Sequence, residues 1–277
     1  MRIHSITALI DQVDISSVAF EAHVEGAIEL IRECGPSAFT SLAFQSIFSS
    51  FRNILAGYSI TRRRSSFLHL PEWLLMPFIG RRKSARERLA DIAVLIPERL
   101  HDTDVLVAGN GPREAGFKME VEQQLQDIDE LLRQLKSWFA HASLEYGGIA
   151  VHYDGTGWST MQNTLSNAPS SVMSFDGGHH KVQLANVPAA GLFLHYWCHI
   201  LELHMCNISL RQLLIDTDLD LPNESREVSS MRLLSSRAAA QEAALLALEA
   251  STWPSSTLEG IVALQFPLKT LARYFSE

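Results

Sequence analysis

Cysteine is scarce in this chain, which excludes a disulfide-built architecture. The 277 residues contain three cysteines, Cys34, Cys198 and Cys206. Three thiols cannot form a closed disulfide framework, and so few are typical of a protein in a reducing compartment. Proline and glycine are also few, at 10 and 15 residues, which disfavours both a multi-stranded protein rich in tight turns and a long disordered region.

Uninterrupted hydrophobic runs are missing as well. The longest apolar stretch, residues 187–203, is interrupted by His195, His199 and Glu202, whereas a transmembrane helix needs about 20 mostly apolar residues. The first 20 residues include Asp11 and Asp14 and show no secretory signal. We therefore expect no membrane association and a nuclear or cytoplasmic location.

Basic residues are outnumbered, and the balance argues against a nucleic-acid-binding surface. The formal net charge is −8, from 31 acidic and 23 basic residues. Such a chain repels the phosphate backbone on average, so we expect no direct nucleic-acid binding. Two local basic segments, Arg62 to Arg64 and Arg81 to Lys83, lack interleaved aromatic residues and a recognition helix. We interpret both as solvated loop ends.

What the chain has in abundance is apolar residues at helical spacing. At 47% hydrophobic and 19% charged residues, it can bury a sizeable core as one domain over residues 1–277, with a sub-boundary possible at 143–186. Apolar periodicity predicts helices over 15–34, 37–56, 84–100, 117–142, 188–214 and 237–249, with another opening at Phe266-Pro267-Leu268. We also expect a helical turn through Trp73, a turn at 109–116 and a surface linker over 216–227.

Residues 146–184 interrupt this helical pattern with many Gly, Ser, Asn and Thr residues. They predict a long central loop that contains a short strand at Ile149 to Tyr153. The predicted fold class is therefore all-α, an irregular multi-helix array with one long central loop.

Three groups of polar residues were weighed as metal sites. His195, His199 and Glu202 stand at i, i+4 and i+7 on one helix face, a donor set that can bind a first-row metal. Tyr196 stands where a zinc protease would carry its general base, and one helix seldom supplies three ligands to one ion, so hydrogen-bonded helix histidines are the preferred interpretation. The acidic run at 127–130 is interpreted as a solvated face, and Asp176, His179 and His180 as loop polarity.

We predict no metal, cofactor or catalytic residue. The chain contains no Gly-x-Ser-x-Gly elbow and no Walker loop. Cys34 ends a predicted helix, where the helix dipole disfavours a thiolate, and Cys198 lies on an apolar helix that predicts burial. Whether the chain is an enzyme stays open, with the balance against it.

Two segments carry a family resemblance. Residues 22–35 read AHVEGAIELIRECG, and residues 62–78 read RRRSSFLHLPEWLLMPF. They resemble the regulatory domain of fungal-specific transcription factors of the zinc binuclear cluster type, in which a His-x-x-Gly-Ala helix precedes a basic Phe-Leu and Glu-Trp stretch that ends in an apolar-Pro-aromatic turn. The matching residues are His23, Gly26, Ala27, Gly35, Arg62 to Arg64, Phe67, Leu68, Glu72, Trp73, Pro77 and Phe78. Asn186, Pro188, Tyr196 and Trp197 are similar to that domain's Tyr-Trp helix, and residues 265–275 to its closing helix.

The resemblance implies a regulatory role without the family's DNA-binding part. That part needs six closely spaced thiolates around two zinc ions, more than three cysteines can supply. We expect a stand-alone regulatory protein that acts through protein partners or a small apolar metabolite, controls a metabolic gene set such as one of secondary metabolism, and can form a homodimer.

The alternative is an enzyme or ligand carrier, for example a cyclase, built on the same helical scaffold around an apolar pocket. Its expected ligand-binding residues are Trp73, Trp158, His195, Tyr196 and His199.

Overall fold

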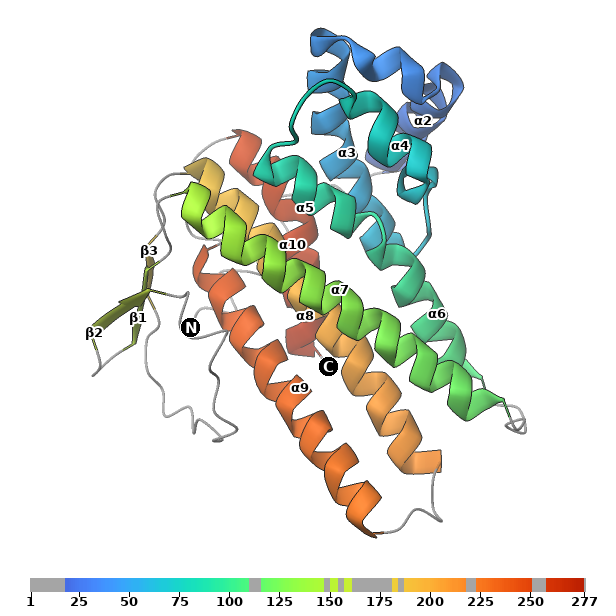
Figure 1. Cartoon of the computed structure of the whole chain (residues 1–277), viewed down its shortest axis with the longest axis vertical. Coiled ribbons are helices and arrows are strands. Elements are labelled where there is room, and N and C mark those ends of the chain that lie inside the picture. The colour runs from blue at the N-terminus through green and yellow to red at the C-terminus, as the bar shows by residue number, and fades with distance from the viewer. Residues whose placement is uncertain are drawn as a thin grey trace.

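The fold is all-α, with one small sheet at its edge (Figure 1). A computed structural model describes residues 18–109, 116–146, 150–153, 157–160, 181–183, 187–217, 223–250 and 258–276. Most of the predicted turn at 109–116 and most of the predicted central loop at 146–184 lie outside the described residues.

The N-terminal part consists of two longer helices followed by short helical turns. Its elements are α2 (Val18–Cys34), η1 (Pro36–Thr40), α3 (Leu42–Arg62), η2 (Phe67–His69), α4 (Pro71–Leu75) and η3 (Met76–Phe78). Helix α2 ends where the sequence predicts, because Gly35 adopts a φ of 71°, a left-handed conformation that glycine reaches without a steric penalty, and Pro36 follows it. The predicted helical turn through Trp73 is confirmed as α4.

Three further helices continue the chain: α5 (Ala85–Ala93), α6 (Ile96–Ala108) and α7 (Phe117–Glu145). Helix α5 begins at a capping box, in which the Ser84 side chain accepts from the Glu87 backbone and the Glu87 side chain accepts from the Ser84 backbone. Pro97 occupies the first turn of α6, where its missing N–H costs nothing. The segment predicted as helical over 84–100 is two helices that meet just before Pro97, a residue expected to interrupt or bend a helix because it lacks an amide donor.

The small sheet consists of β1 (Ala150–Tyr153), β2 (Gly157–Thr160) and β3 (Lys181–Gln183), in the order β2-β1-β3. Both pairings are antiparallel, with Val151 opposite Ser159 on one side and Val182 on the other. The predicted short strand in this region is confirmed as β1.

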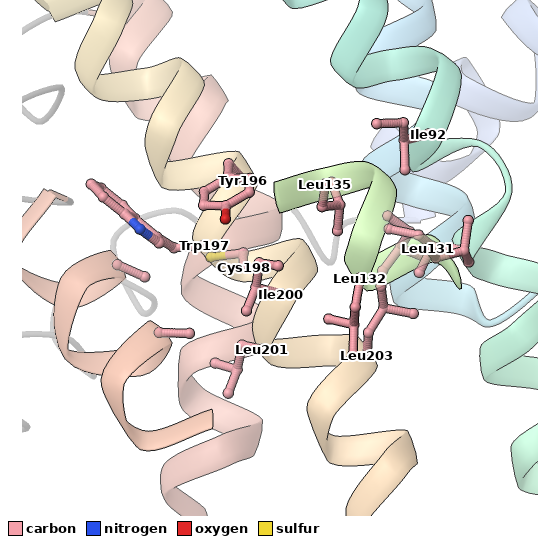
Figure 2. Packing of buried hydrophobic residues seen from close by; sticks show 14 of the residues in the cluster. Ile92, Leu131, Leu132, Leu135, Tyr196, Trp197, Cys198, Ile200, Leu201 and Leu203 are labelled. Carbon is pink, nitrogen blue, oxygen red and sulfur yellow. The ribbon is translucent and has the colours of Figure 1, made fainter. Parts of the chain in front are cut away.

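Helix α8 (Val187–Thr217) is the centre of the structure. It lies beside α9 (Asn223–Ala250) along much of its length and also packs on α6, α7 and α10 (Leu258–Ser276). Figure 2 shows Tyr196, Ile200 and Leu203 of α8 near leucines of α7, within one continuous hydrophobic cluster. Burial on several faces explains why this helix is apolar nearly all round.

A second hydrophobic cluster holds the N-terminal part together. Phe48 and Leu55 of α3 pack there with Trp73 and with Val24 of α2. Phe48 lies 5.8 Å from Trp73 between ring centroids and is completely buried. Ile60, near the other end of α3, belongs to the main cluster around α8. Helix α3 therefore connects the two clusters.

Several helix boundaries differ from the prediction. The helix predicted over 37–56 begins at Leu42 and ends at Arg62, after the separate short helix η1. Helix α8 continues to Thr217 and α9 begins at Asn223, so the predicted linker over 216–227 is wrong at both ends. Helix α10 begins at Leu258, and Pro267 lies inside it rather than at its start. Packing of α10 against α8 and α3 offsets the ladder hydrogen bond that an interior proline removes.

Candidate functional site

The polar face of α8 is turned toward α10. The His199 ring stacks on Phe266 at a centroid distance of 5.2 Å, and the His195 ring lies 5.7 Å from the same residue. Gly57 of α3 makes room for this arrangement, since an added Cβ at that position would lie 3.1 Å from Cβ of Phe266. The structure thus brings His195 and His199 together, with 6.2 Å between their rings.

Glu202, one turn further along α8, belongs to a buried ion-pair network. Its side chain accepts a hydrogen bond of 2.8 Å from Thr270 and pairs with Arg273, both on α10. Arg63, at the end of α3, lies 4.0 Å from the same carboxylate. Glu202 is 1% exposed, so these cations compensate a charge that is withdrawn from water.

Both carboxylate oxygens of Glu202 are engaged by residues of α10, so this side chain has a structural role rather than that of a metal ligand. In the part of the chain that the structure describes, no three His, Cys, Asp or Glu side chains are grouped so that they could hold a metal ion. Burial lowers the pKa of His199 well below its usual value, and neighbouring His195 lowers it further, so its imidazole is neutral. Nδ1 of His199 is buried and has no hydrogen-bond partner among the residues that the structure describes.

The predicted ligand-binding residues are distributed over separate places. Tyr196 points away from the two histidines and stacks on Phe139 of α7 at 4.7 Å. Trp73 belongs to the N-terminal cluster, whereas Tyr196 belongs to the main one. Trp158 lies in β2, but its side chain is outside the described part. Among the four members whose side chains are described, only His195 and His199 lie side by side, so a pocket lined by all five residues stays a prediction.

The acidic residues at 127–130 of α7 have three different partners. Asp127 pairs with Arg99 of α6 at 2.8 Å, whereas Asp129 accepts a hydrogen bond of 3.0 Å from Asn207 of α8. Glu130 pairs with Arg133 on its own helix. Because each carboxylate has its own partner, the run joins helices and does not gather into a magnesium site.

The basic segments fit their interpretation as solvated loop ends in part: Arg62, Arg64 and Arg82 are exposed, but members of both segments form ion pairs. Arg81 pairs with Glu87, and Lys83 lies 2.6 Å from Asp91. The other segment contributes ion pairs from Arg62 to Glu21 and from Arg63 to Asp104, the latter on α6. These residues therefore tie elements together, because burial of neighbouring surfaces brings carboxylates to them.

The three cysteines differ in solvent exposure. Cys198 is completely buried, and burial raises the pKa of its thiol, as expected for a packing residue rather than a nucleophile. Cys206 is buried as well, whereas Cys34 is exposed at the end of α2.

An apolar surface stripe on α3 is the feature that the sequence analysis missed. We call it the α3 stripe, and it consists of Phe44, Ile47, Phe51 and Ile54. These side chains are 54%, 49%, 39% and 39% exposed, respectively. Their intervals of three, four and three residues place them on one helix face, like the contact positions of a coiled coil.

The four residues of the α3 stripe carry no charge, and exposed charge begins one turn further along the same face, where Tyr58 donates a hydrogen bond to the exposed Glu25 of α2. Small side chains, Ala43, Ser46 and Ser50, lie beside it, and the nearest cation within the helix, Arg52, is 1% exposed and faces the core. Leu30, Leu75 and Ile79 are further strongly exposed apolar residues of the same N-terminal part. Exposed apolar residues gathered in this way mark interaction surfaces. The spacing was visible in the sequence, but it could not show which of two apolar faces of α3 would be buried.

Comparison with known proteins adds no relative: no family model, curated protein or solved structure matches this chain. None of the helices in the described ranges is long and apolar enough to cross a membrane.

Proposed function

We propose that this chain is a helical regulatory protein that works by binding other proteins and controls a metabolic gene set. The observation that supports it best is the α3 stripe, an uncharged apolar helix face left at the surface of a chain with a net charge of −8. The resemblance to fungal transcription-factor regulatory domains points the same way, and it favours the nucleus as the site of action. The proposal does not rely on DNA contact by these residues, because their three cysteines are too few for that family's zinc cluster.

The test uses a strain that lacks the gene. Transcript profiles should show a coherent set of metabolic genes changed in the deletion strain, and the wild-type gene should restore them. Phe51→Glu, which places a charge on the α3 stripe, should fail to restore them. Met231→Glu should restore them, because Met231 is an exposed apolar residue on α9, distant in sequence from the stripe. Unchanged transcripts in the deletion strain would contradict a regulatory role.

A ligand carrier or an enzyme of secondary metabolism remains the second candidate. It is supported by two buried nitrogen atoms on α8, Nδ1 of His199 and Nε1 of Trp197, which have no hydrogen-bond partner within the described ranges, since such groups are often satisfied by a bound molecule. Loss of one late metabolite with unchanged transcripts would favour this candidate. His199→Ala should then weaken binding of that metabolite to the purified protein.

A further inference from the structure

We propose that the α3 stripe binds the same stripe of a second copy of this chain, so that two α3 helices pack antiparallel in a symmetric dimer. The inference rests on the proposed function only in taking the stripe as a protein-binding face. A symmetric dimer needs a self-complementary surface, because the same patch is used twice.

The absence of exposed charge makes the α3 stripe self-complementary. A chain with a net charge of −8 repels its copies through most of its surface. Between Leu42 and Gly57 the only charged residue is Arg52, which is buried. This part of α3 can therefore pack against its copy without opposing like charges from the two helices, and the small residues Ala43, Ser46 and Ser50 let the helices approach closely.

The position of α3 favours the antiparallel arrangement. The end of α3 near Ile60 packs into the main cluster, whereas its first half lies at the far end of the molecule with α2 and α4 (Figure 1). Antiparallel pairing puts the two main clusters on opposite sides of the contact, whereas parallel pairing would bring them against each other. A twofold axis midway along the stripe places Ile47 against Phe51 of the partner subunit.

The buried area predicts a weak dimer. With side chains of on the order of 200 Å² each, the four exposed fractions amount to roughly 350 Å² of apolar surface per copy. The total of roughly 700 Å² lies below the ~1,200 Å² at which stable interfaces begin, so we expect reversible association with a dissociation constant in roughly the micromolar range.

The experiment is sedimentation velocity of the purified full chain, from below to above that concentration range. We expect the wild type to shift from monomer to dimer, and Ile47→Glu and Phe51→Glu each to weaken association by at least about tenfold, since each places two like charges in the contact. Met231→Glu is the control and should dimerise like the wild type. All substituted positions are exposed, and circular dichroism confirms that each variant is folded.

A pair of double variants tests the antiparallel register. Ile47→Glu combined with Phe51→Lys puts opposite charges against each other across the twofold axis, whereas Ile47→Glu combined with Phe51→Glu puts like charges there. We expect the first to dimerise at least about tenfold more tightly than the second. Equal affinities would overturn the antiparallel register.

A wild type that stays monomeric at every concentration would overturn the dimer, and so would a dimer that both single glutamate variants leave intact. If the wild type is monomeric while Phe51→Glu still fails to restore transcripts, the stripe binds a different protein and the proposed function stands. A dimer together with unchanged transcripts in the deletion strain would instead refute the proposed function alone.

Discussion

Glu87 offers a direct measurement of how much a buried, hydrogen-bonded carboxylate stabilises this fold. It is 6% exposed and lies at the start of α5, where it closes the capping box with Ser84. Arg81 donates to both of its carboxylate oxygens, and Ser49 of α3 donates to one of them. Burial alone would raise the pKa of Glu87, but the hydrogen bonds from Arg81, Ser49 and Ser84 outweigh it and lower the pKa from 4.5 to about 2.

The perturbation is Glu87→Gln, which keeps the size of the side chain and removes its charge. Because the pKa is lower in the folded than in the unfolded state, the carboxylate stabilises the fold fully above about pH 4.5 and loses that contribution as the pH falls toward 2. A shift of this size corresponds to about 3 kcal/mol. At neutral pH the variant should therefore be less stable than the wild type by about that amount.

The assay is urea unfolding followed by circular dichroism, at several pH values from about 7 to about 3. The difference in unfolding free energy between wild type and variant should shrink below about pH 4.5. The other carboxylates are present in both proteins, so their contributions to the pH dependence cancel in this difference. Glu29→Gln is the matched control, since Glu29 pairs with Arg32 at the surface with 58% of its side chain exposed, and it should cost less than about 1 kcal/mol. A difference that is independent of pH would refute the reasoning.

Three further results are expected. Glu202→Ala should lower the unfolding free energy by about 3–5 kcal/mol, because it removes a buried carboxylate that pairs with Arg273 and accepts a hydrogen bond from Thr270; a loss below about 1 kcal/mol would show that solvent replaces it. Phe48→Ala should cost about 3–5 kcal/mol and Phe44→Ala, one turn earlier but 54% exposed, less than about 1, in the same urea assay. In the native protein a thiol reagent should modify Cys34 alone, and the two buried cysteines should react only on unfolding.

The spacing of apolar residues in the sequence predicts most of the helices of this protein. Val24, Ile28 and Ile31 recur at helical spacing within the predicted helix over 15–34, and all three are buried in α2. Gly35 marks the end of that helix in sequence and in structure. Boundaries that depend on partners were harder to predict, as with α10, whose interior Pro267 is accepted only because the helix packs on α8 and α3.

In the candidate sites, too, the sequence predicted features within one helix but not the contacts between helices. Sequence spacing placed His195, His199 and Glu202 on one face of α8, and the structure agrees. The sequence spacing could not show that Arg273 and Thr270 of α10 would contact the carboxylate of Glu202, because those residues are about 70 positions away in the chain. Nor could it separate Trp73 from Tyr196, which the folded chain assigns to different hydrophobic clusters.

By itself the sequence determined that this protein is helical, that its three cysteines are too few for a closed disulfide framework or a six-thiolate zinc cluster, and that α8 is an apolar helix. These properties follow from composition and from spacing along a single helix, which are local. The tertiary structure alone decided which apolar face of α3 is covered: Phe48 is buried and the α3 stripe is not. Which face is covered depends on the elements that pack against it, and these come from elsewhere in the chain.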